Sequence, residues 1–243
     1  MAGMFAGIDQ SVKVEVEEEK LGGGGYVKDT GSYNFIIEMA YGGQSAGGAY
    51  FIDVKLKSED GQRMNVREYI TSGEAKGVRP YYIDKDGKQR ALPGYAKMNA
   101  LDVLLTGNAE QYPNTETKTI PMWNKEAEKE VPTEANVVVD WIGKPITALV
   151  RCVREFKQVK NESTGKWVNG TETKETGEVL HFVDPITGQT RAEKLSGKDA
   201  TVKPSFDNKY NSDYVLDKTK GKGKPAAAAA TPTPPADSPF GNK

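Results

Sequence analysis

The sequence predicts a mainly β protein in which an antiparallel barrel or sandwich carries one helix, and three observations favour this fold class. Most apolar segments are rich in Val, Ile, Tyr, Phe and Thr, which are common in strands. Gly and Asp clusters separate these segments, as turns separate antiparallel strands. Only Tyr95–Thr106 places apolar residues at helical spacing. An antiparallel barrel with one packed helix is the simplest arrangement.

The expected strands follow one another along the chain. Val12, Val14 and Val16 alternate with polar residues, which is the period of a strand. The expected helix ends at Gly107, a typical C-terminal stop. The polar segment 108–135 is long for a connection, so it is either a functional loop or contains a hairpin. Further strands are expected at Ser32–Tyr41, Ala49–Lys57, Met64–Thr71, Asn136–Ile142, Ile146–Val159 and Glu178–Val183.

The C-terminal part of the chain differs in composition from the rest. From Lys218 to Lys243 the chain consists mainly of Lys, Gly, Ala, Pro and Thr, which offer almost nothing to bury. Such a segment does not offset the entropy of ordering. We therefore expect one folded domain over residues 1–217 and a disordered tail over residues 218–243.

Composition excludes several classes of protein. The 33 Lys and Arg against 34 Asp and Glu give a net charge of −1, so the chain is not a globally basic binder. A mean hydropathy of −0.63 without a long apolar run argues against a transmembrane protein. Residues 1–10 lack the features of a signal peptide, so a cytosolic location is expected. With one cysteine (Cys152) and one histidine (His181), neither an intramolecular disulfide nor a Cys/His zinc site can form.

Cations are nevertheless concentrated in two segments. Residues 63–97 hold eight Lys and Arg against four acids, and residues 144–160 hold five against Glu155 alone. If the two segments are neighbours in space, one face of the protein carries a positive groove. In the second segment, strict alternation places Arg151 and Arg154 on opposite faces of a strand, so a bulge or a strand end is needed to bring them together.

The first basic segment also contains Tyr81, Tyr82 and Tyr95. Binding of single-stranded nucleic acid needs both components, because cations follow the phosphates and aromatic rings stack on uncovered bases. The alternative is a solvated hairpin whose tyrosines face the core. Under the binding hypothesis the three tyrosines line the groove, and the predicted phosphate contacts are Lys76, Arg79, Lys85, Lys88, Arg90, Arg151 and Arg154.

Catalytic and cofactor motifs are not evident, so we expect a non-catalytic protein without metal or cofactor. Gly22–Gly25 lacks the spacing of a dinucleotide-binding loop. Asp84–Gly87 resembles the start of a calcium loop, but Tyr95 stands where the later acidic ligand is required, so a hairpin turn is expected. His181 has no activated-serine signature nearby, and Cys152 is expected to be a small core residue. A metal nuclease remains the third alternative, because acids are plentiful.

The region from Gly31 to about Gly107 resembles phage-encoded single-stranded DNA-binding proteins. The resemblance rests on Gly48-Ala49 before the strand Tyr50–Lys57, on Tyr69–Gly73 with Ala75–Gly77, on Tyr81-Tyr82 before a charged turn, and on Leu92–Tyr95 entering the helix. It implies an oligonucleotide-binding (OB) barrel that coats displaced strands during DNA replication, recombination and repair in the cytoplasm of an infected bacterium. Such barrels bind without a cofactor and with little sequence preference.

The end of the chain is similar to the tip by which bacterial single-stranded DNA-binding proteins recruit partner enzymes. Asp237, Pro239 and Phe240 match that tip and are the predicted contacts for replication, recombination or transcription proteins. The sequence departs from the pattern because Asp237 is the only acid between Pro225 and Lys243, and because three residues follow Phe240. A short motif on a disordered tether raises the local concentration of a partner without a large interface.

Two alternative functions come before the metal nuclease. A phage transcription-activating or strand-annealing protein would also bind single strands. A virion or scaffolding β-protein would share the strands and glycines but would have no need for cations grouped with tyrosines.

Overall fold

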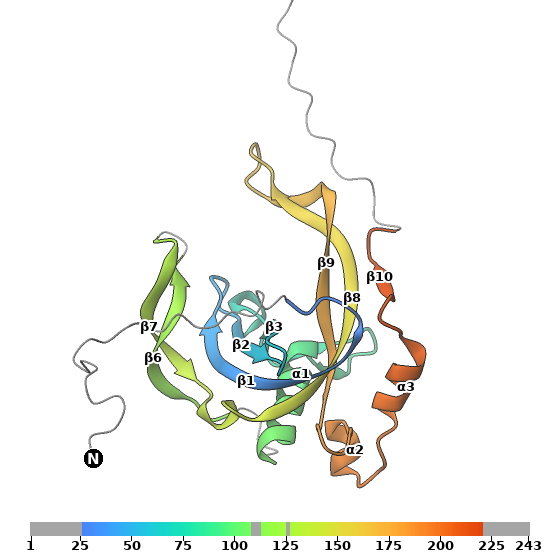
Figure 1. The fold of residues 1–243 in the computed structure, drawn as a ribbon. Coiled ribbons are helices and arrows are strands. Elements are labelled where there is room, and N and C mark those ends of the chain that lie inside the picture. The colour runs from blue at the N-terminus through green and yellow to red at the C-terminus, as the bar shows by residue number, and fades with distance from the viewer. Residues whose placement is uncertain (1–25, 108–112, 125–126, 221–243) are drawn as a thin grey trace, which may run out of the picture.

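The computed structural model describes residues 26–107, 113–124 and 127–220 (Figure 1). The helices are α1 (Pro93–Thr106), α2 (Arg191–Leu195) and α3 (Val202–Lys209), with short 3-10 turns η1 (Glu74–Lys76) and η2 (Val139–Trp141). The strands are β1 (Gly31–Gln44), β2 (Tyr50–Lys57), β3 (Arg63–Tyr69), β4 (Tyr81–Ile83), β5 (Gln89–Ala91), β6 (Glu116–Asn124), β7 (Lys129–Val137), β8 (Pro145–Lys160), β9 (Trp167–Val183) and β10 (Val215–Asp217).

Strand β1 is the centre of an eight-stranded, mostly antiparallel sheet. Its first half pairs with β8 and its second half pairs with β2, and an irregularity between Ile37 and Met39 separates the two halves. Strand β3 continues the sheet beside β2, and β9 continues it beside β8. The predicted mainly β, antiparallel fold is therefore confirmed.

The two ends of this curved sheet, β3 and β9, face each other across a gap that we call the seam. Within the described residues no strand ladder joins them. Instead, Val27 fills one end of the seam, where its N–H donates to the Arg63 carbonyl oxygen at 2.9 Å. A Cβ atom on Gly177 of β9 would lie 2.7 Å from the Val27 carbonyl oxygen, so the close approach requires glycine.

Helix α1 packs against β3 and β9 at the other end of the seam (Figure 1). Its buried face carries Met98, Leu101 and Leu104, which join the main core between the sheet and the helix. Pro93 occupies the first turn, where its missing N–H costs no hydrogen bond, and Gly107 ends the helix with a φ of 73°. The expected helix is confirmed and begins two residues earlier than predicted. The prediction of a single helix is wrong, because α2 and α3 follow β9.

Several other expectations have an outcome in the structure. The segment 108–135 does contain a hairpin, formed by β6 and β7, and Asp84–Gly87 is the turn between β4 and β5. The expected strand Asn136–Ile142 is wrong beyond Val137, because residues 139–141 form η2 and bury Trp141. Strand β9 begins at Trp167, well before the expected Glu178. Cys152 is buried in the core as expected.

The remaining expectations concern parts of the chain at either terminus. The expected strand at Val12, Val14 and Val16 and the partner motif near Phe240 lie outside the described residues. Lys218, the first residue of the expected tail, is described, and its N–H donates to the Arg154 carbonyl oxygen at 2.9 Å. Among the described residues, no helix is both long and apolar enough to cross a membrane.

Candidate nucleic-acid interface

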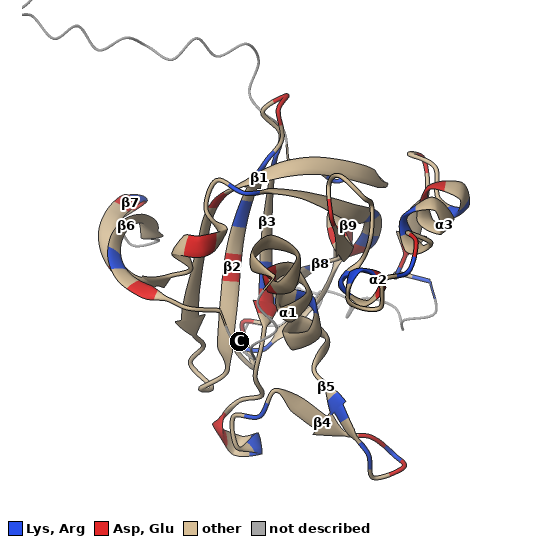
Figure 2. Ribbon diagram, turned by 90° about the horizontal axis from the view of Figure 1, so that it is seen from below, with Lys and Arg blue, Asp and Glu red and all other residues tan. Residues whose placement is uncertain are grey.

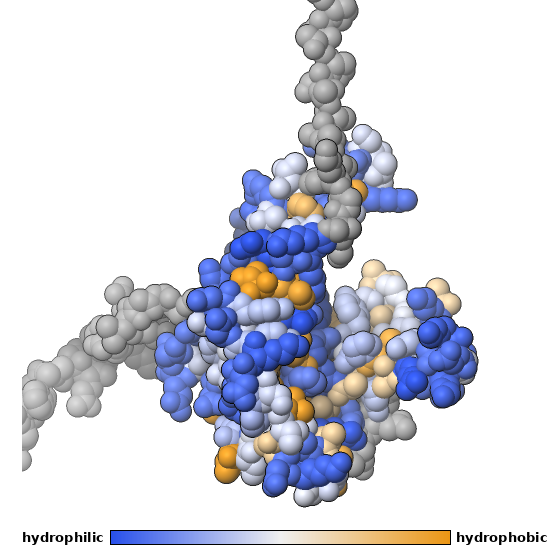
Figure 3. Space-filling view, turned by 90° about the vertical axis from the view of Figure 1, so that its right-hand side faces the viewer, coloured by the Kyte–Doolittle hydropathy of each residue, from blue (hydrophilic) through white to orange (hydrophobic). Residues whose placement is uncertain are grey.

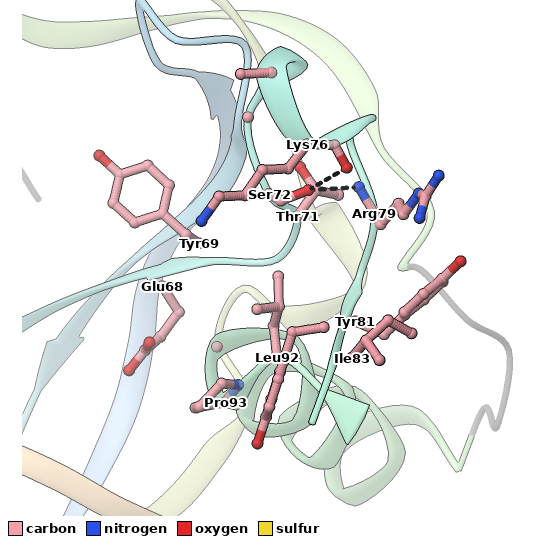
Figure 4. Close-up of a pocket in the computed structure, with 14 residues that line it drawn as sticks. Glu68, Tyr69, Thr71, Ser72, Lys76, Arg79, Tyr81, Ile83, Leu92 and Pro93 are labelled. Carbon is pink, nitrogen blue, oxygen red and sulfur yellow. Dashed lines mark hydrogen bonds between the residues drawn. The ribbon is translucent and has the colours of Figure 1, made fainter. Parts of the chain in front are cut away.

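A cavity of about 660 Å³ lies where the end of β3, the η1 loop, the β4–β5 hairpin and the start of α1 meet (Figure 4). Its walls are mainly apolar and aromatic surface, with cationic side chains among the lining residues. We call this space the cavity. The residues that line it are Glu68, Tyr69, Thr71, Ser72, Gly73, Ala75, Lys76, Arg79, Tyr81, Tyr82, Ile83, Leu92, Pro93 and Gly94.

Local contacts hold the walls of the cavity in place. Ser72 accepts a hydrogen bond from the Arg79 N–H at 2.9 Å through its hydroxyl, and its own N–H donates to the Arg79 carbonyl oxygen at 2.8 Å. These bonds close the loop that carries Lys76. At the opposite wall, a Cβ atom on Gly94 would lie 2.3 Å from the Tyr69 carbonyl oxygen. The helix can therefore begin directly against the end of β3 only because this residue is glycine.

Tyrosine rings border the cavity on two sides. Tyr69 is 47% exposed and Tyr82 is 48% exposed, so both rings are accessible. Tyr81 is half-buried, and the Arg79 guanidinium lies 5.9 Å from the centre of its ring. Because Tyr81 and Tyr82 are consecutive in β4, their side chains leave opposite faces of the hairpin. The structure therefore brings both predicted tyrosines to the cavity, but on different faces of one wall.

Four of the predicted cations are available to a ligand. Lys76 and Arg79 line the cavity, while Lys85 and Lys88 lie in the turn of the β4–β5 hairpin, which extends from the body of the protein (Figure 2). None of the four forms an ion pair with another described residue. By contrast, Arg90 in β5 pairs with Asp84 at 2.8 Å and lowers the pKa of that carboxyl.

The other predicted site residues lie elsewhere. Tyr95 packs against the main core from α1 and is not part of the cavity wall. Arg151 and Arg154 lie on β8, where they pair with Glu178 at 2.8 Å and with Glu175 at 2.6 Å. The β8–β9 register is regular between the two arginines, so the pleat keeps them on opposite faces. No bulge brings them together.

Sequence reasoning missed a second group of side chains, on the outer face of β2 and β3. The Arg67 guanidinium lies 4.2 Å from the centre of the Phe51 ring. Asp53 accepts two hydrogen bonds from it, at 2.6 and 2.5 Å, and these bonds raise the pKa of Arg67. Tyr69 follows on the same face, and its ring meets Phe51 edge-on at 5.8 Å. Alternation within the two strands could have placed these residues on one face, but their contacts depend on the register.

The buried side chain of Tyr41 lies next to Asp53, the carboxylate that holds Arg67. Burial and the neighbouring Asp53 carboxylate raise the pKa of Tyr41 to about 12, so its hydroxyl stays protonated. Tyr41 lies opposite Asp53 in the β1–β2 ladder, and Asp53 lies opposite Arg67 in the β2–β3 ladder. The three side chains form one row across the sheet. A guanidinium held flat in this way offers a plane on which a base can stack.

Other exposed aromatic residues lie on the two long hairpins. Trp123 in β6 is 66% exposed and Trp167 in β9 is 67% exposed. Figure 3 shows hydrophobic residues as scattered patches among hydrophilic ones on the face that it presents. Neither tryptophan lines the cavity.

The described residues contain no group of three or more His, Cys, Asp or Glu side chains that could hold a metal ion.

No protein-family model matches the chain, and no curated protein matches it either.

Proposed function

We propose that the protein binds single-stranded DNA, without catalysis and with little sequence preference, through the cavity and the β4–β5 hairpin. One observation carries the proposal. Lys76 and Arg79, which have no ion-pair partner among the described residues, line the cavity with the exposed rings of Tyr69 and Tyr82. Lys85 and Lys88, also without such a partner, lie in the turn of the adjoining hairpin. Most other cations of the described residues are neutralised by a carboxylate, as Arg151 and Arg154 are.

The unpaired cations and the exposed tyrosine rings match the chemistry of an unpaired strand. Phosphates attract the free lysine and arginine side chains, while accessible rings stack on bases at about 1–3 kcal/mol per base. If Lys76, Arg79, Lys85 and Lys88 each neutralise one phosphate, the logarithm of the affinity falls with the logarithm of the salt concentration at a slope of about −3. Stacking does not depend on base identity, which accounts for weak sequence preference.

The order of elements supports an OB-type barrel as the scaffold. Strands β1, β2 and β3 form a meander, α1 follows β3, and β8 then returns to pair with β1 before β9. We propose that Val27 and α1 complete this barrel where β3 and β9 do not pair. Barrels of this type present one open face and its loops to oligonucleotides.

The resemblance to phage proteins supports a role in DNA replication, recombination and repair within an infected bacterial cell. In this proposal the tail after Lys220 recruits partner proteins through Asp237, Pro239 and Phe240. Replacing Phe240 with Ala would then leave DNA affinity unchanged and remove a replication, recombination or transcription protein from a pull-down. Unchanged recovery of all such partners would refute the role of the tail.

The test of the proposal is a fluorescence anisotropy titration of the full chain with oligo-dT, a duplex and RNA of equal length, at two salt concentrations. We expect the tightest binding to oligo-dT, much weaker binding to duplex, and weaker binding at the higher salt concentration. A protein that binds none of the probes would fit the virion or scaffolding alternative and refute the proposal. Tighter binding to duplex than to oligo-dT would also refute it.

A further inference from the structure

We propose that a bound strand leaves the cavity along the seam between β3 and β9 and reaches Lys28, Arg154 and Lys174 at the foot of the β8–β9 hairpin. This inference rests on the proposed function, because it concerns the path of the same ligand. It assigns a second set of phosphate contacts, to residues that do not line the cavity.

Four cavities lie in a row along the seam, and neighbouring cavities share wall residues. The cavity shares Glu68 with a polar cavity of about 390 Å³ between β3 and β9. That space shares Asn65 with a third cavity of about 280 Å³ beside Val27. The third shares Lys28 with a fourth, of about 490 Å³, at the foot of the β8–β9 hairpin. The row of cavities therefore runs from the β4–β5 hairpin to β8 and β9.

The chemistry of the walls changes along this row. The cavity is mainly apolar and holds the rings, and the second and fourth cavities are mainly polar. The small third cavity between them is mainly apolar. The charged residues that line the second are Arg67, Lys97 and Lys218 with Glu68, Glu155 and Glu178. Lys28, Arg154 and Lys174 line the fourth together with Glu175. An apolar, aromatic cavity at one end of the row and a polar cavity with three cations at the other fit a strand whose bases are bound at the first and whose phosphates are bound at the second.

In the second cavity, Glu68 and Glu178 already pair with Lys97 and Lys218. The carboxylates that pair with the cations of the fourth cavity do not block the path. Arg154 pairs with Glu175 at 2.6 Å and Lys174 pairs with Glu155 at 3.2 Å, and all four side chains are between 32% and 45% exposed. Exposed pairs of this kind contribute about 0–1 kcal/mol, so a phosphate can replace the carboxylate at low cost. Lys28 is exposed and has no ion-pair partner among the described residues.

This path also gives the second basic segment a place in the interface. Arg154 lines the fourth cavity, while Arg151 lines none of the four and is mostly covered, with 21% of its side chain exposed. Because the two arginines lie on opposite faces of β8, they have different roles in this proposal. Arg154 contacts the strand, and Arg151 supports β9 through its ion pair with Glu178.

The experiment compares oligo-dT of about 5 and about 16 nucleotides, which bracket the site sizes of single OB barrels. The variant is the triple substitution Lys28→Gln, Arg154→Gln and Lys174→Gln. We expect its affinity for the short probe to stay within about twofold of wild type, and its affinity for the long probe to fall about tenfold. The salt slope for the long probe becomes shallower by about 2, from three lost contacts.

A matched control removes three lysines that line none of the four cavities. Lys194 and Lys203 are ion-paired in or beside α2 and α3, and Lys198 has no ion-pair partner among the described residues. Their triple replacement with Gln makes the same change in charge and should leave both probes unaffected. Melting temperatures of all variants are compared to show that each is folded.

Three results would overturn the path. These are an unchanged affinity of the seam variant for the long probe, an equal loss for both probe lengths, and an equal loss in the control. Lys55 lies on the outer face of β2. If its replacement weakens binding of the long probe and the triple substitution at Lys28, Arg154 and Lys174 does not, the path runs across the sheet instead. Failure of the wild-type protein to bind either probe would refute the proposed function itself, and the path with it.

Discussion

The indole N–H of Trp141 donates a hydrogen bond of 2.7 Å to Oδ1 of Asp102, and both side chains are buried. This bond joins η2 to the middle of α1, the helix whose first turn lines the cavity. A buried carboxylate needs such a donor, because its desolvation is otherwise uncompensated.

Replacing Asp102 with Ala should therefore lower the free energy of unfolding by about 2–4 kcal/mol, since the indole N–H loses its acceptor and a small cavity forms. Asp102→Asn keeps an oxygen acceptor and should cost clearly less. Urea denaturation of both variants tests this, and equal stability of Asp102→Ala and wild type would show that the bond does not stabilise the fold.

The fold was predictable wherever apolar residues alternate along a buried strand. The prediction of Ser32–Tyr41 and Ile146–Val159 lies within a few residues of β1 and β8. The first eleven residues of β9 were missed, because this part belongs to a long hairpin and has few buried side chains to produce a pattern. Val137, Val138 and Trp141 are all buried, but a 3-10 turn buries the tryptophan where a strand was expected.

The candidate site was predictable only where its residues are close in sequence. Lys76, Arg79 and Tyr82 are neighbours along the chain and also line one cavity. The contact between Phe51 and Arg67 depends on the register of β2 against β3, which composition does not reveal. In the same way, the neutralisation of Arg151 and Arg154 depends on acids that β9 supplies.

Gly177 is the residue of β9 against which the Val27 backbone packs. Replacement with Ala should destabilise the protein by about 1–3 kcal/mol, because the new Cβ would lie 2.7 Å from the Val27 carbonyl oxygen. Gly47→Ala is the matched control, since a Cβ there would meet no atom within 4 Å. Thermal melting compares the two variants, and similar melting temperatures would mean that Val27 does not close the seam.

Glu193 links the start of α2 to the start of α3. Burial raises the pKa of its carboxyl, but hydrogen bonds from Thr201 and Thr190 outweigh burial and lower the pKa to about 2, from a usual value of 4.5. A lowered pKa in the folded state stabilises the protein above the unfolded pKa, and this contribution is lost as pH falls through the folded pKa.

We therefore expect Glu193→Gln to lower the free energy of unfolding by about 1–3 kcal/mol near neutral pH. The difference between wild type and variant should shrink as pH falls from 4.5 towards about 2, because the wild-type carboxylate becomes protonated. Denaturant titrations at several pH values measure this difference. A difference that stays constant with pH would contradict the role of the ionised carboxylate.

The Arg67 guanidinium, held by Phe51 and Asp53, should act as a stacking plane rather than as a simple charge. Arg67→Lys keeps the charge and loses the plane, so affinity for oligo-dT should fall about threefold to tenfold with the salt slope unchanged. Arg63→Lys, in the same strand, is the control and should have little effect. A fall in the salt slope without loss of affinity at low salt would contradict stacking.

The most direct test of the central claim removes one ring and one free cation from the cavity. Lys76→Gln with Tyr82→Ala should weaken oligo-dT binding at least tenfold without changing the melting temperature, given about 1–3 kcal/mol for a stacked base and one lost phosphate contact. The control, Lys166→Gln with Trp167→Ala, removes an exposed ring and cation from the β8–β9 hairpin and should bind within about twofold of wild type. Equal binding by the cavity variant and wild type would show that these residues do not form the DNA site.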